Sequence, residues 1–234
     1  MRSRWKLFLL LLAALLFCSC GRYAIPSDTA YLRKPVFVID PGHGGEDGGA
    51  VSADGLKESE INLAVCRRLS GLLGLLGYET VMTRDSEELA YPPDAGTVRH
   101  RKQADMDRRI ALVNGTPGAV LVSVHQNKYP DAAPEGAQVY YQNGELSKGF
   151  AEYVSGVLKT GLGDTVRPAA RIPDNIYLMR KIECPGILIE CGFLSNPREL
   201  GLLRSESYQT KLALCISCAC AGYADVLEGE YGKG

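Results

Sequence analysis

Short apolar runs alternate along the chain with longer segments in which apolar residues recur every three or four positions. The short runs are typical of buried strands, and the longer segments are typical of helices that bury one face. Five strands are expected, at residues 36–40, 79–83, 119–124, 137–141 and 186–190. Four helices are expected, at residues 61–76, 99–113, 146–157 and 208–226.

Strands and helices that alternate in this way predict an α/β fold. We expect a single domain with a twisted, mostly parallel open sheet and helices on both faces. Two long loops are expected, at residues 85–97 and 163–175. A further short helix is expected to begin with Asn196 as its cap, Pro197 at its first position and Glu199 completing a capping box.

The N-terminal segment carries a different pattern. Three basic residues within the first six positions precede an unbroken apolar run at residues 7–18, which is the order found in a signal peptide. At ~1.5 Å per residue this run is short for a hydrocarbon core of ~30 Å. We therefore expect residues 1–20 to be a signal peptide or membrane anchor, residues 21–34 to be an exposed lead-in, and the protein to work outside the cytoplasm. Cleavage, lipid attachment at Cys20 and retention in the membrane stay open as alternatives.

Composition excludes several classes of protein. Apolar residues make up 46% of the 234 residues and charged residues 23%, which is the balance of a globular chain and not of a disordered one. The 26 lysines and arginines are matched by 27 aspartates and glutamates, so no basic excess favours nucleic acid as a partner.

Cysteines are numerous, but the chain is long enough to fold without disulfides. Those beyond residue 20 are Cys66, Cys184, Cys191, Cys215, Cys218 and Cys220. We expect them to act mainly as small apolar residues of the core, and a Cys184–Cys191 bridge is left open. Cys215 and Cys218 have no second pair at zinc-finger spacing, so a structural zinc site is not expected there.

Polar residues with metal-binding side chains follow the predicted strands. His43 follows the first strand, His125 follows the third, and Glu190 ends the fifth. In an open α/β sheet, ligands bind beyond the carboxyl ends of the strands. Glu58, at the start of the first helix, is expected near the loop that carries His43. Two imidazoles and one carboxylate form the ligand set of an open catalytic zinc site, so these three residues are candidate ligands of Zn²⁺, and Glu190 is a candidate general base.

Each of these residues also has a structural explanation. His43 alone could be a turn residue, and His125 alone could be a buried residue at a strand end. The favourable charge at a helix start explains Glu58 alone. Glu190 is harder to explain in this way, because a buried carboxylate after an apolar run is costly without a partner. Spacing alone names no substrate.

Four motifs, in order, resemble those of the zinc-dependent N-acetylmuramoyl-L-alanine amidases. They are VIDPGHGG at residues 38–45, Glu58 with Asn62 and Leu63, SVHQN at residues 123–127, and ECGFLSN at residues 190–196. The resemblance extends from about Pro35 to Val226. It implies that His43, Glu58 and His125 bind zinc and that Glu190 is the catalytic glutamate.

The resemblance also implies a substrate. Such enzymes cleave the amide between the lactyl group of N-acetylmuramic acid and L-alanine, so peptidoglycan is the expected substrate. Residues 35–228 are expected to form the catalytic domain, and residues 229–234 a C-terminal tail. Residues 99–114 and 208–213 are most similar to the branch that acts in making spore-cortex peptidoglycan, where amidase action precedes lactam formation. Ser59-Glu60 departs from the Lys-Asp that is common in the family.

In the implied mechanism, Glu190 takes a proton from the attacking water and returns one to the leaving amine. Asp40 and Asn127 are expected to orient the histidines. Two alternatives stay open: a non-catalytic exported wall-binding protein on the same fold, and another zinc hydrolase of peptidoglycan, such as a carboxypeptidase or a deacetylase. The sequence identifies no activator protein, and membrane attachment through the N-terminal segment is left open.

Overall fold

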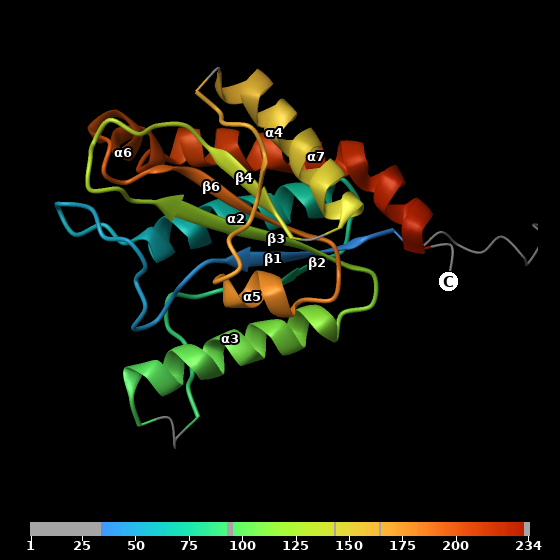
Figure 1. The fold of residues 1–234 in the computed structure, drawn as a ribbon, viewed down its shortest axis with the longest axis horizontal. Helices are drawn as coiled ribbons and strands as arrows, with labels where there is room; N and C mark the ends of the chain where they lie inside the picture. The colour runs from blue at the N-terminus through green and yellow to red at the C-terminus, as the bar shows by residue number, and fades with distance from the viewer. Residues whose placement is uncertain (1–33, 93–95, 143, 164, 232–234) are drawn as a thin grey trace, which may run out of the picture. The chain divides into compact units, whose positions relative to one another are not determined.

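A six-stranded sheet forms the centre of the structure, a computed structural model that describes residues 34–92, 96–142, 144–163 and 165–231. Its strands are β1 (Val36–Pro41), β2 (Thr80–Met82), β3 (Ala119–Asn127), β4 (Gln138–Tyr141), β5 (Ala170–Arg171) and β6 (Gly186–Phe193), in the order β2-β1-β3-β6-β4-β5 (Figure 1). The neighbours β2, β1, β3 and β6 are parallel, β4 runs antiparallel to β6, and β5 runs parallel to β4. The predicted open and mostly parallel sheet is confirmed.

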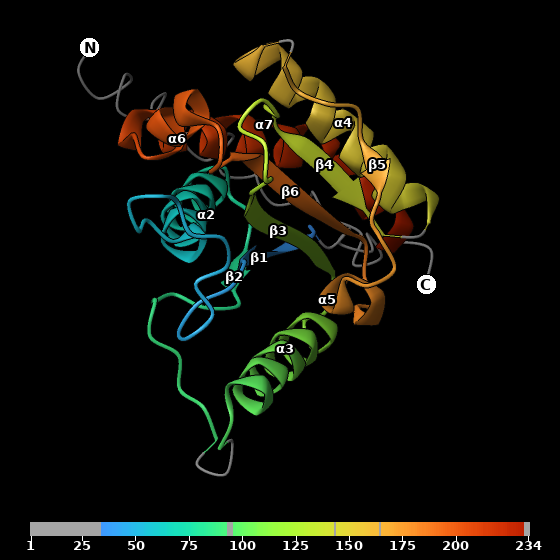
Figure 2. The same cartoon turned by 60° about the vertical axis from the view of Figure 1, so that its left-hand side comes forward.

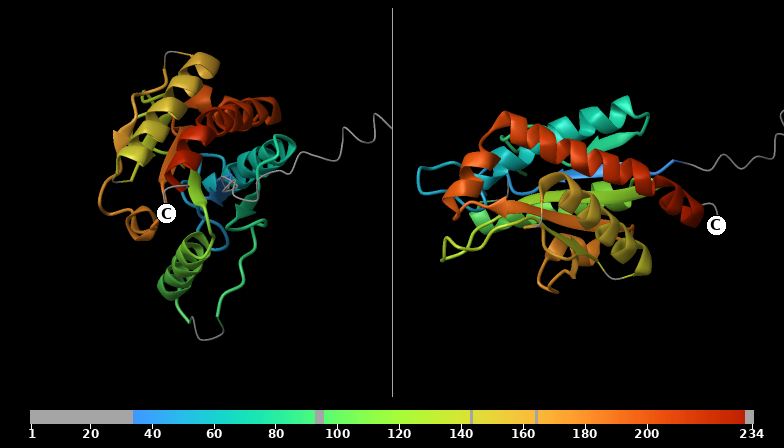
Figure 3. Two further views of the ribbon diagram at one scale, coloured as in Figure 1. Left: turned by 90° about the vertical axis from the view of Figure 1, so that its right-hand side faces the viewer. Right: turned by 90° about the horizontal axis from the view of Figure 1, so that it is seen from above.

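Helices cover both faces of this sheet, as predicted. One face carries α2 (Glu58–Leu75), α4 (Glu145–Leu162) and α7 (Glu206–Tyr231), and the other carries α3 (Val98–Asn114) and α5 (Tyr177–Lys181) (Figure 2). The right-hand view of Figure 3 shows α7 running between α2 and α4, and it contacts both. The short helix α6 (Pro197–Leu203) lies between β6 and α7 in the chain.

Side chains alternate between two apolar cores. In β1, Phe37 and Ile39 belong to the larger core beneath α2, α4 and α7, whereas Val38 belongs to the smaller core beneath α3 and α5. In β3, Val122 and Leu121 divide in the same way, and all five side chains are completely buried. A strand that is buried on both faces needs apolar residues at every position, which explains the continuous runs in the sequence.

The start of α6 uses its predicted cap only in part. The Asn196 side chain accepts hydrogen bonds from the N–H groups of the two residues after Pro197, at 3.0 and 3.2 Å, as predicted. Glu199 does not complete a capping box, so that part of the prediction is wrong. Its carboxylate accepts hydrogen bonds from the N–H groups of Phe193 and Gly136, both at 2.8 Å. Glu199 therefore ties α6 to β6 and to the loop before β4.

Three boundaries differ from the sequence prediction. β5 lies within the expected loop at residues 163–175, and α5 follows that loop without having been predicted. α7 continues to Tyr231, into the expected tail at 229–234. The expected export segment 1–20, and the lead-in apart from its last residue, lie outside the described residues.

The cysteines beyond residue 20 are free thiols. The bridge left open between Cys184 and Cys191 is therefore not formed. Cys66, Cys191 and Cys220 are buried in the larger core, as expected, whereas Cys218 is exposed on α7. The expectation of a core role is wrong for Cys218.

By length and composition, the segment Glu206–Glu228 of α7 could cross a membrane. Its apolar residues Leu212, Ile216 and Leu227 are nevertheless buried in the larger core. This burial is typical of a core helix in a water-exposed domain.

Candidate metal centre

The candidate residues lie at the carboxyl end of the parallel strands. His125 in β3 and Glu190 in β6 are register partners across the β3–β6 ladder. Each lies an even number of residues after a member of the smaller core, Leu121 and Leu188, so both side chains point to the face covered by α3 and α5. His43 follows β1, and Glu58 is the first residue of α2. Four residues that are distant in the chain thus share one edge of the sheet.

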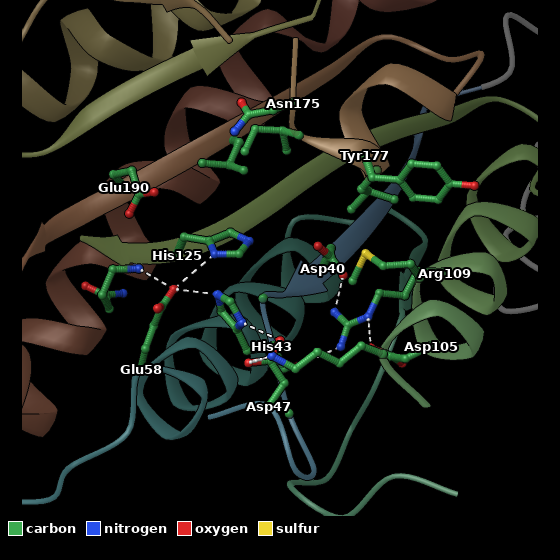
Figure 4. Close-up of a pocket in the computed structure, with 18 of the residues that line it drawn as sticks. Asp40, His43, Asp47, Glu58, Asp105, Arg109, His125, Asn175, Tyr177 and Glu190 are labelled. Carbon is green, nitrogen blue, oxygen red and sulfur yellow. Dashed lines mark hydrogen bonds and ion pairs between the residues drawn. The ribbon is translucent and has the colours of Figure 1, made fainter. Parts of the chain in front are cut away.

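Glu58 lies between the two imidazoles. Its Oε1 is 3.4 Å from His43 Nε2 and 3.0 Å from His125 Nδ1 (Figure 4). The potential ligand atoms of the three residues lie within 4.8 Å of one another, and the imidazole planes meet at 79° with their centroids 5.0 Å apart. Two imidazole nitrogens and a carboxylate oxygen are the donor set of an open zinc site. The arrangement therefore fits zinc in the number, type and spacing of its donors.

Hydrogen bonds hold the Glu58 carboxylate in place. Oε2 accepts from the Ala50 N–H at 2.8 Å, and Oε1 accepts from the Gln126 N–H at 3.1 Å and from Asn62 Nδ2 at 3.3 Å. Burial alone would raise the pKa of Glu58, but hydrogen bonds with the two histidines hold it well below its usual value. Glu58 is therefore a fixed negative charge, and its bonds go well beyond what a helix start requires.

A second carboxylate, Asp47, holds the other side of the His43 ring. His43 Nδ1 is 3.1 Å from Asp47 Oδ2, while Asp47 Oδ1 is 3.0 Å from Lys102 Nζ and accepts from the Gly49 N–H at 3.3 Å. Burial would lower the pKa of His43, but the bonds with Asp47 and Glu58 raise it to about 9. With Nδ1 engaged, Nε2 is the nitrogen that faces the centre. Asp47 is not among the site residues predicted from the sequence, although its place four residues after His43 in a glycine-rich loop is a signal that could have found it.

Two arginines hold the backbone that carries His43. Arg109 is completely buried, forms an ion pair with Asp40 at 2.6 Å, and donates to the carbonyl oxygens of Pro41 at 2.7 Å and His43 at 2.6 Å. Arg84 also donates to the Pro41 carbonyl oxygen, at 3.0 Å. These bonds secure a loop in which His43 has a φ of 60°, a conformation that few non-glycine residues adopt.

The prediction that Asp40 and Asn127 orient the histidines is wrong. The two oxygens of Asp40 are bonded to Arg109 and to two buried hydroxyl groups. The Asn127 side chain accepts from the N–H of the next residue, at 2.8 Å. Asp40 therefore acts one step further out, by fixing Arg109, while Asp47 contacts His43 Nδ1 directly.

Two glycines leave room for the site residues. A Cβ at Gly42 would lie 2.2 Å from His125 Cε1, and a Cβ at Gly49 would lie 2.5 Å from Glu58 Oε2. Gly49 also has a φ of 67°, which favours glycine. A larger residue at either position would displace an imidazole or the carboxylate.

Glu190 lies beside this group without being tied into it. Its Oε2 is buried and has no hydrogen-bond partner among the described residues, and burial raises the pKa of Glu190 to about 7. A carboxyl group with that pKa can both take and give a proton near neutral pH. Glu190, His43, Glu58 and His125 line one cleft of about 410 Å³, whose other wall comes from α3 and α5 (Figure 4). The cleft can therefore place a substrate against both the donor cluster and a proton carrier.

The sequence pattern of the N-acetylmuramoyl-L-alanine amidases matches residues 37–221, a range that includes His43, Glu58, His125 and Glu190. The chain belongs to this family. As an N-acetylmuramoyl-L-alanine amidase, it is an enzyme that acts on peptidoglycan.

Similar amidases are known from several bacteria. The germination-specific N-acetylmuramoyl-L-alanine amidase of Bacillus subtilis is 36% identical over 222 residues, which cover 92% of each chain. Among solved structures, the CwlD amidase from Clostridioides difficile, in complex with the GerS lipoprotein, aligns with a TM-score of 0.79 and 31% identity over 83% of this chain and 100% of that one. The catalytic domain of the amidase CwlV from Bacillus (Paenibacillus) polymyxa var. colistinus aligns with a TM-score of 0.70 and 29% identity over 82% and 99%.

These similarities confirm the predicted family and fold class. They favour an amidase over the carboxypeptidase, deacetylase and non-catalytic alternatives that the sequence leaves open.

Proposed function

We propose that this amidase depends on zinc held by His43, Glu58 and His125, and that Glu190 carries the protons of hydrolysis. One observation supports this most strongly: a loop, a helix start and a strand direct three donors to one point, beside the Glu190 carboxylate, whose buried Oε2 has no hydrogen-bond partner in the described part of the chain. Burying polar and charged groups together in this way lowers the stability of the fold, and such clusters are typical of functional sites. Two imidazoles favour zinc over harder cations such as magnesium or calcium.

The bond to be broken joins the lactyl carbonyl of N-acetylmuramic acid to the nitrogen of L-alanine. Zinc, when bound, supplies a Lewis acid that polarises the carbonyl and lowers the pKa of water in the site. Glu190 accepts one proton from the attacking water and delivers it to the nitrogen as the C–N bond breaks. One water is consumed, and the products are a lactyl carboxylate and a stem peptide with a free amine. Glu190 is suited to both transfers because burial places its pKa at about 7.

A role in spore peptidoglycan is the finer part of the proposal. The Bacillus subtilis relative is named as germination-specific, and the similarity covers nearly all of both chains. In this role, removal of the stem peptide frees the lactyl group of muramic acid for lactam formation in the cortex.

Location and partner follow from the same proposal. Residues 35–228 form the catalytic domain, and residues 1–20 direct it across the membrane to its substrate, with residues 21–34 as the lead-in. The similar CwlD amidase was solved in complex with the GerS lipoprotein, so a lipoprotein is our candidate activator for this chain. Retention of residues 1–20 in the membrane would keep the enzyme close to such a partner.

Digestion of purified peptidoglycan followed by mass spectrometry of the products tests the proposal. The zinc-loaded chain is expected to release stem peptides that begin with a free L-alanine amine. Treatment with a chelator should stop this release, and added zinc should restore it. Loss of D-alanine or of acetate in place of stem peptides, or digestion that chelation leaves unchanged, would contradict the proposal.

A further inference from the structure

The cleft at the metal centre continues along the first turns of α3. A second hollow, of about 400 Å³, is lined by Val98, Arg99, Lys102, Gln103, Met106 and Tyr177. Lys102, Met106 and Tyr177 also line the cleft of the metal centre, so the two hollows share a wall. Figure 4 shows the Tyr177 ring directed away from His125 toward α3. We name this second hollow the α3 extension.

The α3 extension carries an excess of positive charge. Arg99 is exposed and makes no ion pair with any residue in the described part of the chain. Lys102 is half exposed and has one carboxylate contact. Two further cations, Arg180 and Lys181, lie over the Tyr177 ring, at 5.7 and 6.0 Å from its centroid.

Two carboxylates of α3 lie close to the α3 extension, and neither forms an ion pair with Arg99: Asp105 is paired outside the hollow, whereas Asp107 is bonded to two of the residues that line it. Asp105 forms ion pairs with two arginines of its own helix, at 2.8 and 2.9 Å. Asp107 accepts hydrogen bonds from Gln103 at 2.9 Å and from the Tyr177 hydroxyl at 3.4 Å. Neither group balances Arg99, so the hollow suits an anionic ligand.

The leaving group of the proposed reaction is anionic. A stem peptide begins with L-alanine, and the D-glutamate that follows is linked through its side-chain carboxyl, which leaves its α-carboxylate free. Later residues add further carboxylates. The glycan on the other side of the scissile bond offers mainly hydroxyl and acetamide groups, which carry no charge. Only the peptide side of the substrate therefore matches the charge of the α3 extension.

The length of a stem peptide also agrees with the length of the α3 extension. An extended peptide advances ~3.5 Å per residue, so the carboxylates of the second and third residues lie roughly 5–12 Å beyond the scissile nitrogen. Along α3, Met106 and Arg99 are separated by ~10 Å at a rise of ~1.5 Å per residue. Lys102 contacts the Asp47 carboxylate that holds His43, so the hollow begins beside the metal centre. Arg99 lies three residues before Lys102 on α3, so the two cations of the hollow are about one helical turn apart.

We propose that the α3 extension binds the stem peptide, with Arg99 and Lys102 paired to its carboxylates and Tyr177 packed against its chain. This inference rests on the proposed function, because it assigns the leaving side of the same cleft. It makes Arg99 a specificity-determining residue, and it gives the substrate a direction, with the peptide along α3 and the glycan away from it.

Binding of the product peptide tests this inference without any turnover. The probes are L-Ala-γ-D-Glu-diaminopimelate and the same peptide with its carboxylates converted to carboxamides. Calorimetry compares their affinities for the wild-type chain, for Arg99→Gln, and for Lys211→Gln, which removes one exposed cation from α7 on the opposite face of the sheet. Both residues are exposed, so neither substitution disturbs the core.

We expect the wild-type chain to bind the carboxylate peptide about threefold to tenfold more tightly than the carboxamide peptide, as for a partly exposed ion pair. Arg99→Gln should lose most of this preference, and Lys211→Gln should keep it. Equal binding of both peptides to the wild-type chain, no binding of either, or an unchanged preference in Arg99→Gln would each overturn the inference.

The outcome of the peptidoglycan digestion and the outcome of this peptide-binding experiment are independent of each other. A chain that prefers the carboxylate peptide but releases no stem peptide with zinc would overturn the proposed function and leave the binding assignment standing. With the active enzyme, Arg99→Gln should raise KM by a similar factor and leave kcat almost unchanged, because uniform binding is lost. A fall in kcat at unchanged KM would overturn the assignment.

Discussion

Glu190 lies directly opposite His125 in the register of the parallel strands β6 and β3. The separation between the proposed proton carrier and a proposed zinc ligand is thus set by the central sheet, whose strands lie ~4.8 Å apart. His43, in contrast, comes from a loop, and its position depends on Asp47 and on buried arginines. The sheet and the loop therefore make separable contributions to the site, and substitutions can test each.

Substitution of Glu190 tests the proton carrier. Glutamine has the same shape but cannot exchange the proton, so Glu190→Gln should keep its zinc and lose about 10²–10⁴-fold in the rate of stem-peptide release. Elemental analysis gives the zinc content, and product mass spectrometry gives the rate. His125→Ala is the contrasting variant and should lose both zinc and activity. Near-normal turnover by Glu190→Gln would remove Glu190 from the mechanism.

Substitution of Asp47 tests whether its contact with Nδ1 of His43 helps to hold this proposed zinc ligand in place. Asp47→Ala removes the partner of His43 Nδ1 and should weaken zinc affinity about 10- to 100-fold, measured by competition with a chelator. Activity should largely return at saturating zinc, because Asp47 positions His43 and does not touch the substrate. The matched control is Asp54→Ala, which removes an exposed aspartate paired with Arg204. Equal losses of affinity in the two variants would argue against a positioning role.

The buried pair of Asp40 and Arg109 predicts how stability depends on pH. Burial would raise the pKa of Asp40, but Arg109 and two hydroxyl groups lower it from 3.8 to about 2. Because the pKa is lower in the folded state, the carboxylate stabilises the fold above about pH 4, and this contribution is lost as the pH falls through about 2. It amounts to about 2 kcal/mol of the free energy of unfolding.

Urea unfolding between pH 2 and pH 6 measures this contribution. Asp40→Asn should lack this component of the pH dependence, and near neutral pH it should be less stable by about 3 kcal/mol, because Arg109 loses its buried partner. If the variant does not fold, the slope of the wild-type curve remains the test. A wild-type stability that stays level from pH 4 to pH 2 would contradict the assignment.

Most of the fold could be predicted because its central strands are buried on both faces. The run at residues 119–124 has no polar interruption before Ser123, and such runs indicate parallel strands covered by helices. β5 could not be predicted, because its two residues are a strand only through their pairing with Tyr140 and Tyr141. α5 is too short to show a period, and it depends on the burial of Leu178 in the smaller core.

Of the candidate site, the residues at the strand ends could be predicted from the sequence, but the residues that support them could not. His125 and Glu190 are visible in the sequence because polar residues that end apolar strands share one edge of the sheet. Arg109 is not visible, because an arginine in a highly charged helix is typical of an exposed face. Only the docking of α3 over the end of β1 buries it completely. Residues that support a site through tertiary contacts leave little periodic trace in a sequence.

Diffraction data collected at the zinc absorption edge, from crystals of the zinc-loaded chain, test the central claim most directly. One anomalous peak is expected, ~2.0–2.1 Å from His43 Nε2 and His125 Nδ1 and ~2.0–2.2 Å from a Glu58 oxygen, with Glu190 outside the set of ligands. A peak that does not touch all three residues, or one that takes Glu190 as a ligand, would contradict the account.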